Sequence, residues 1–185
     1  RVRASIERDL VRHELTHTAQ DGSGVRYQGD DRFGIAAGRW AALNERTRTR
    51  IEEEVAAFLA QAARADDPGV VLLRLLRPLL DVDQPTLDGA AYYFAARYLF
   101  NAIAGSPADA WVDATSPETG PILELFDRLA SQPDVTRERA TRLFTEGFRG
   151  LPLLALHRQV EFDRAQGLNE EVGDSMFGSR AFVRW

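Results

Sequence analysis

The chain has 185 residues, of which 44% are hydrophobic, and its formal net charge is −5 at pH 7. Its length and apolar content suffice for a single domain with a substantial core. The acidic balance, without a dense basic tract, argues against a nucleic-acid partner. The absence of cysteine excludes disulfides and thiolate metal ligands. No apolar run reaches the roughly 18 residues that a membrane-spanning helix needs.

Hydrophobic periodicity and helix-breaking residues predict one mostly helical domain over residues 1–185, with at most a small β element. Helices are expected at about 4–20, 39–65, 70–80, 86–104, 121–130, from the turn at 131–134 to about 148, and at 151–166. Between the first two helices, residues 25–37 are expected to form a loop or a short hairpin. Residues 167–185 are expected to be an irregular tail, in which 180–185 could form a strand.

The most informative feature is the run His13-Glu14-Leu15-Thr16-His17. Histidines four residues apart lie on one face of a helix, so both imidazoles can reach one metal ion at roughly 2.0–2.1 Å. Glu14 lies about 100° around the helix, close enough to contact a water on that ion. The pattern therefore predicts two metal ligands and a carboxylate that acts as a general base.

The residues around this run suggest that the histidines point into the protein. One helical stripe joins Ile6, Leu10, His13, His17 and Gln20, and an adjacent stripe joins Val11, Leu15 and Ala19. A helix that is apolar on two sides is expected to be buried on both. The alternative interpretation is an ordinary core helix whose histidines are satisfied by hydrogen bonds.

This run resembles the active-site helix of the zincin metallopeptidases, over about residues 5–20. The extension to Gln20 gives HExxHxxQ, which is similar to metallopeptidase-like domains associated with bacterial contractile injection systems and toxins. The metzincin continuation HxxGxxH is absent, because Gln20 and Ser23 stand where its Gly and third His would be. The resemblance therefore implies a Zn²⁺ cofactor, a glutamate as third ligand as in gluzincins, and a peptide or protein substrate.

Several glutamates compete for the third ligand position. Glu53 opens a segment similar to the E-G-[FL]-A-x-[YF] segment of several gluzincins, although Glu54 stands where the family usually has Gly. Glu53 also shares its helix face with small alanines, which allow another helix to approach closely. Glu45 follows Asn44, similar to the Asn-Glu pair of thermolysin-like enzymes, and Glu146 opens another E-G-F run. We expect Glu53 to bind the metal, with Glu45 second and Glu146 third; each could instead belong to a solvated acidic face.

Three further residues are candidates for the catalytic site. A peptidase must stabilise the oxyanion that forms when water attacks a carbonyl. Tyr92 and Tyr93 lie on an aromatic-rich helix that looks like one carrying tyrosines into the cleft of some zincin-like proteins. His157 lies in an apolar helix. The alternative role of all three is core packing.

The expected function is that of a zinc-dependent metallohydrolase, most simply a peptidase. Zincins usually pair the substrate backbone with the edge strand of a sheet. Only about a dozen residues precede His13, so the strands would have to come from Val25–Ile35 and the C-terminal tail, or from outside this chain. The alternatives are a helical interaction or structural module without turnover, and a non-haem iron oxygenase.

Overall fold

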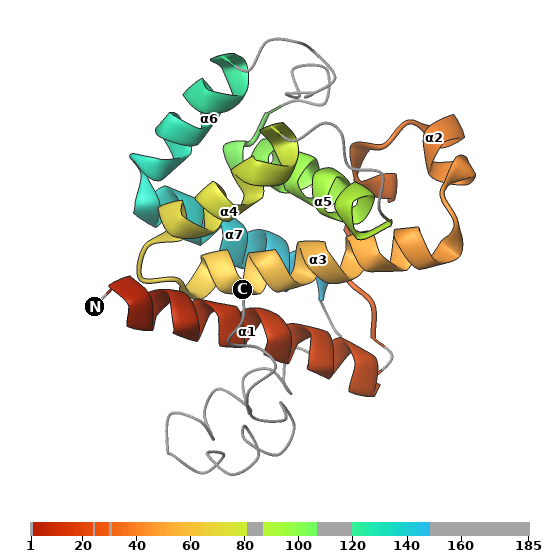
Figure 1. Cartoon of the computed structure of the whole chain (residues 1–185), viewed down its shortest axis with the longest axis horizontal. Helices are drawn as coiled ribbons and strands as arrows, with labels where there is room; N and C mark the ends of the chain where they lie inside the picture. The colour runs from red at the N-terminus through yellow and green to blue at the C-terminus, as the bar shows by residue number, and fades with distance from the viewer. Residues whose placement is uncertain (1, 24, 30, 81–86, 107–119, 149–185) are drawn as a thin grey trace.

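The computed structural model describes residues 2–23, 25–29, 31–80, 87–106 and 120–148. Those residues form seven α-helices and one 3₁₀ helix and contain no strand (Figure 1). The helices are α1 (Val2–Ser23), α2 (Ala37–Ala42), α3 (Glu45–Arg64), α4 (Pro68–Leu80), α5 (Leu87–Ala104), α6 (Gly120–Ala130) and α7 (Pro133–Gly147), with the 3₁₀ helix η1 at Asp31–Gly34. The predicted mostly helical fold is confirmed.

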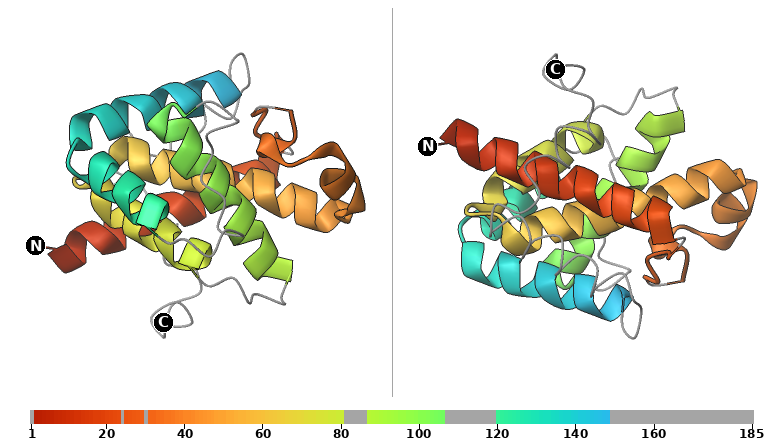
Figure 2. Two further views of the ribbon diagram at one scale, coloured as in Figure 1. Left: turned by 90° about the horizontal axis from the view of Figure 1, so that it is seen from above. Right: turned by 90° about the horizontal axis from the view of Figure 1, so that it is seen from below.

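Helix α3 lies at the centre of the molecule. It packs against α1, α4, α5 and α7, which surround it in Figures 1 and 2. All residues from Glu54 to Ala62 are buried, and most of them are apolar. A helix that is apolar on all sides has to be covered on all sides, so this sequence places α3 in the core.

Helix α1 rests on α3 with a polar face. The two helices lie side by side in both Figure 1 and Figure 2. Among the side chains of α1 that the structure describes, the buried ones are Asp9, His13, Thr16, Ala19 and Gln20. Ile6 is exposed, and Leu10, Val11 and Leu15 are only partly buried. The expectation of a helix buried on two apolar sides is therefore wrong, because the face that meets α3 is polar.

The single helix predicted at 39–65 is in fact two helices. Leu43 has extended backbone, and Asn44 caps α3 by accepting a hydrogen bond from the Thr47 amide at 2.8 Å. An asparagine side chain satisfies a free amide at a helix start better than it supports a helix interior. The chain therefore breaks at Leu43 and Asn44, and α3 begins at Glu45.

Residues 25–37 were predicted to form either a loop or a short hairpin. The described residues of this segment form a loop that contains η1 and leads into α2, and no strand lies among them. Arg32, Phe33 and Gly34 all have positive φ values, of 65°, 51° and 65°. The resulting turn places Phe33 in the core, where its ring contacts Tyr27, Trp40 and Tyr98. The described residues of Val25–Ile35 therefore do not supply the strands considered for a peptidase. The strand considered at 180–185 and the helix predicted at 151–166 lie outside the described residues.

Candidate metal centre

Three side chains from α1 and α3 meet in the interface between these helices: His13, His17 and Glu54. The two histidine Nε2 atoms lie 3.1 Å apart. The Nε2 atom of His13 lies 3.3 Å from Glu54 Oε2, and that of His17 lies 3.6 Å from Glu54 Oε1. His13 and Glu54 are buried, with 3% and 0% of their side chains exposed, and the figure for His17 is 12%.

These distances fit a tetrahedral metal ion. Ligand atoms about 2.0–2.1 Å from a tetrahedral zinc ion lie about 3.3 Å from one another. Neither Glu54 oxygen has a partner that meets hydrogen-bond geometry in the described part of the chain, although Oε1 forms an ion pair with Arg50. Two imidazoles and a carboxylate that converge in this way are a donor set for zinc. The three groups could therefore hold a divalent cation, with a fourth position left for a water or a substrate atom.

The third group is Glu54, and the prediction of Glu53 is wrong. Glu53 lies about 100° further round α3 and forms ion pairs with two arginines. Its Oε1 lies 2.6 Å from Arg26 Nη1, and its Oε2 lies 3.6 Å from Arg50 Nη1. With both oxygens turned toward guanidinium groups, Glu53 is a link in a surface charge network.

The two other glutamates considered from the sequence are also not at the centre. Glu45 is the first residue of α3 and is exposed, nine residues before Glu54 and about 13 Å from it along the helix axis. Glu146 is exposed in the last turn of α7. Neither belongs to the group of side chains that could share a metal ion.

Charge and burial favour the protonation states in which two of these side chains bind a metal, the neutral imidazole of His17 and the carboxylate of Glu54. Burial lowers the pKa of His17 from 6.5 to about 4, although the Glu54 charge opposes the shift, so His17 is neutral at pH 7. Burial alone would raise the pKa of Glu54, but His13, His17 and Arg50 together lower it below its usual 4.5. Arg50 Nη2 lies 2.9 Å from Glu54 Oε1.

Aromatic residues form one wall beside the centre. The His13 ring packs edge-on against Phe58, with ring centroids 4.6 Å apart, and Phe58 contacts Tyr92 of α5 at 6.2 Å. Burial raises the pKa of Tyr92 to about 12, and the charges of Glu54 and Glu14 add to this shift. The Tyr92 hydroxyl is therefore close enough to the Glu54 and Glu14 carboxylates for their charges to act on it.

Of the two remaining candidates, only Tyr93 lies in the described part of the chain. Tyr93 follows Tyr92 on α5, so its side chain points about 100° away, and its ring packs on Phe94 with centroids 5.3 Å apart. The predicted catalytic role of Tyr93 has no support in this contact. His157 lies outside the described residues.

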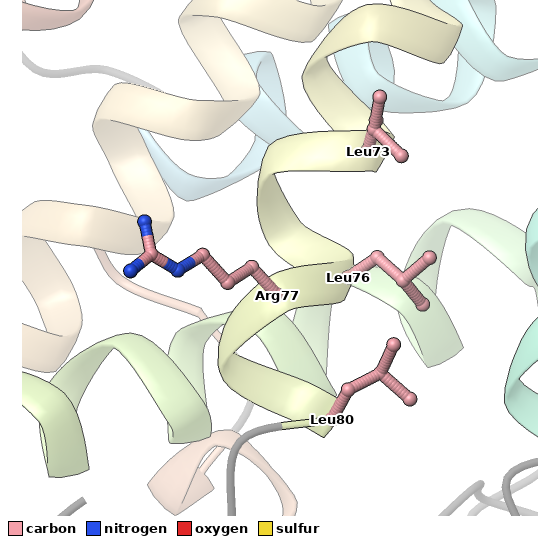
Figure 3. Close-up of a pocket in the computed structure, with 4 residues that line it drawn as sticks. All are labelled: Leu73, Leu76, Arg77 and Leu80. Atoms are coloured by element: carbon pink, nitrogen blue, oxygen red, sulfur yellow. The ribbon is translucent and has the colours of Figure 1, made fainter.

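A shallow hollow on α4 is a separate feature. It is lined by Leu73, Leu76, Arg77 and Leu80, and Leu73 is 57% exposed (Figure 3). None of these residues belongs to the metal centre, and an apolar hollow with one arginine offers no catalytic group. The group formed by His13, His17 and Glu54 therefore remains the candidate site.

Comparisons with protein-family models, with curated proteins and with solved structures give no match to this chain. No helix among the described residues is long and apolar enough to cross a membrane. The features of this chain that bear on a function are therefore the geometry of the site and the resemblance of residues 5–20 to the zincin active-site helix.

Proposed function

We propose that this protein is a zinc-dependent hydrolase that cleaves peptide bonds. The observation that carries the proposal is the convergence of two histidine Nε2 atoms and the Glu54 carboxylate within the HExxH helix and its neighbour. Zinc bound there would polarise a substrate carbonyl and lower the pKa of a coordinated water. The choice of a peptide as substrate follows from the zincin resemblance of residues 5–20.

The protein's own residues have complementary roles in this reaction. The Glu14 carboxylate accepts a proton from the attacking water and passes it to the nitrogen of the leaving amine, so that the proton is conserved. Tyr92 remains protonated at neutral pH, since its pKa is raised to about 12. Its hydroxyl can therefore donate a hydrogen bond to the carbonyl oxygen as negative charge develops there.

A second candidate function is a metal-bearing module without turnover. Two observations favour it: the His13 and Glu54 side chains are only 3% and 0% exposed, and the described residues contain no strand that could pair with a substrate. Such a module would hold the metal with four protein ligands. A non-haem iron centre uses the same donor set, so the identity of the metal separates it from both.

The first test is the metal content of protein purified without added metal, measured by inductively coupled plasma mass spectrometry. We expect near-stoichiometric zinc in the wild type and its loss in His17→Ala. Iron in place of zinc would favour an oxygenase. No metal in either protein, even after zinc is offered, would mean that the histidines are core residues.

The second test separates the enzyme from the inactive module. Glu14→Gln should keep the zinc and lose about 100-fold or more of peptide cleavage, because an amide cannot accept the proton. Glu7→Gln, which alters an exposed carboxylate of the same helix, is the matched control and should leave cleavage unchanged. Wild-type cleavage in Glu14→Gln would refute this mechanism.

A further inference from the structure

Arg50 connects the candidate ligand Glu54 to its neighbour Glu53. Its Nη2 atom lies 2.9 Å from Glu54 Oε1, and its Nη1 atom lies 3.6 Å from Glu53 Oε2. The three residues share α3 at spacings of three and four, which bring side chains together on one helix face. The guanidinium therefore uses both of its terminal nitrogens on consecutive carboxylates.

The two oxygens of Glu54 have different neighbours. Oε2 lies 3.3 Å from His13 Nε2, on the side where the histidines converge. Oε1 lies close to Arg50 and 3.6 Å from His17 Nε2. One oxygen is thus available to a metal ion, while the other is held by a cation from the same helix.

The outer end of this contact is also anchored. Glu53 Oε1 lies 2.6 Å from Arg26 Nη1, in the segment that follows α1. The contacts thus form a chain of alternating charge that begins at the fully buried Glu54. It continues through Arg50, which is 34% exposed, and Glu53, which is 13% exposed, and ends at Arg26, which is 47% exposed. A planar guanidinium held at both nitrogens has less freedom than a single ammonium would have.

We propose that Arg50 is a positioning residue that makes Glu54 a ligand through one oxygen only. This inference rests on the proposed metal centre. A carboxylate free of Arg50 could bind the ion with both oxygens and take the position that a hydrolase keeps open. Arg50 also balances the buried charge of Glu54 when the metal is absent, which would otherwise destabilise the fold.

The test compares zinc affinity and cobalt spectra of the wild type, Arg50→Gln and Arg50→Lys. Arg46→Gln is the control, because Arg46 is exposed one turn earlier on α3. We expect the zinc affinity of Arg50→Gln to differ from that of the wild type by roughly 10- to 100-fold, because Glu54 loses the partner that orients it and gains a second oxygen for the ion. The visible absorption of its cobalt form should weaken, as it does when the coordination number rises. Arg46→Gln should match the wild type.

Wild-type affinity and a wild-type cobalt spectrum in Arg50→Gln would overturn the inference while leaving the metal centre intact. If Arg50→Gln does not fold, Arg50→Lys decides, since it keeps the charge but cannot bridge two carboxylates. A wild-type spectrum in Arg50→Lys then overturns the inference, and a weakened one supports it. A wild-type protein that binds no zinc would overturn the proposed function itself.

Discussion

Glu54 is a carboxylate with no exposed side-chain surface, in the middle of the central helix. A buried charge is tolerated only when nearby groups compensate for it. Here the compensation comes from Arg50 on one side and from two imidazoles on the other. Its immediate neighbour Glu53 has the same chemistry but faces two partly exposed arginines.

This difference predicts that the same substitution has a large effect on zinc affinity at Glu54 and a small one at Glu53. Glu54→Gln should lower zinc affinity by at least about 100-fold, because a neutral amide is a poor ligand for the ion. Glu53→Gln removes the same charge from the same helix. Its zinc affinity should stay within about tenfold of that of the wild type, since Glu53 is not a ligand and can affect the ion only through its contact with Arg50. Competition with a chromogenic chelator measures both. A larger loss in Glu53→Gln than in Glu54→Gln would reverse our assignment of the ligand.

His17 predicts how the metal-free protein responds to acid. Burial lowers its pKa from 6.5 to about 4, so the unfolded chain binds a proton at a higher pH than the folded one. The stability that this difference represents is complete above pH 6.5 and is lost as the pH falls from 6.5 toward 4. The loss amounts to about 3 kcal/mol at most. The lowered pKa of Glu54 acts in the same direction, but below pH 4.5.

Urea unfolding at pH 7.5 and pH 4.5, with a chelator present, measures this loss. In His17→Gln the fall in unfolding free energy between the two pH values should be smaller by about 2 kcal/mol or more. Subtracting the fall measured for the variant from that of the wild type cancels the contribution of the carboxylates that titrate in this pH range. An equal fall in both proteins would show that His17 stays accessible to protons in the folded state.

At the scale of helices, the sequence allowed prediction of the elements but not of how they face each other. Helix type and approximate bounds follow from periodicity and from breakers such as Gly105 and the 131–134 turn. The polar contact between α1 and α3 could not be recognised in the same way. An apolar stripe marks a core face, whereas Asp9, Thr16 and Gln20 are of types that usually face water.

The sequence of α3 contains a pattern that indicates Glu54 as the third member of the metal site. Thr47, Ile51, Glu54, Phe58 and Gln61 recur at spacings of three and four along α3, and all five are buried. A glutamate inside an otherwise buried stripe requires compensating partners, which the histidines supply. Glu53 was favoured for its small neighbours and its resemblance to a known segment. Those criteria ignored that a shared ion has to lie on the face where the two helices meet.

At the scale of the whole molecule, α1 differs from the other helices in how it is held. Helices α3 to α7 share an apolar core, to which α1 contributes only Ala19 among its described side chains. Among the described residues α1 packs mainly against α3, through His13 and His17, which face Glu54, and through Arg12, which donates to the Arg64 carbonyl at 2.8 Å. Polar contacts stabilise less than apolar burial of similar extent. Helix α1 should therefore open more readily than the rest of the fold.

This arrangement predicts that zinc protects α1 selectively. Zinc binds only when α1 lies on α3, so openings that separate the two helices should become about 100-fold rarer at a zinc concentration of 100 times Kd. Hydrogen exchange measured by mass spectrometry, with zinc or with a chelator, should show slowed exchange in α1. Helix α6, which packs against α4, α5 and α7, should change little. His17→Ala should abolish the effect, because its α1 can still dock but cannot complete the metal site. Equal slowing in α1 and α6 would mean that α1 opens only when the whole molecule unfolds, and that the polar contact is as strong as the core.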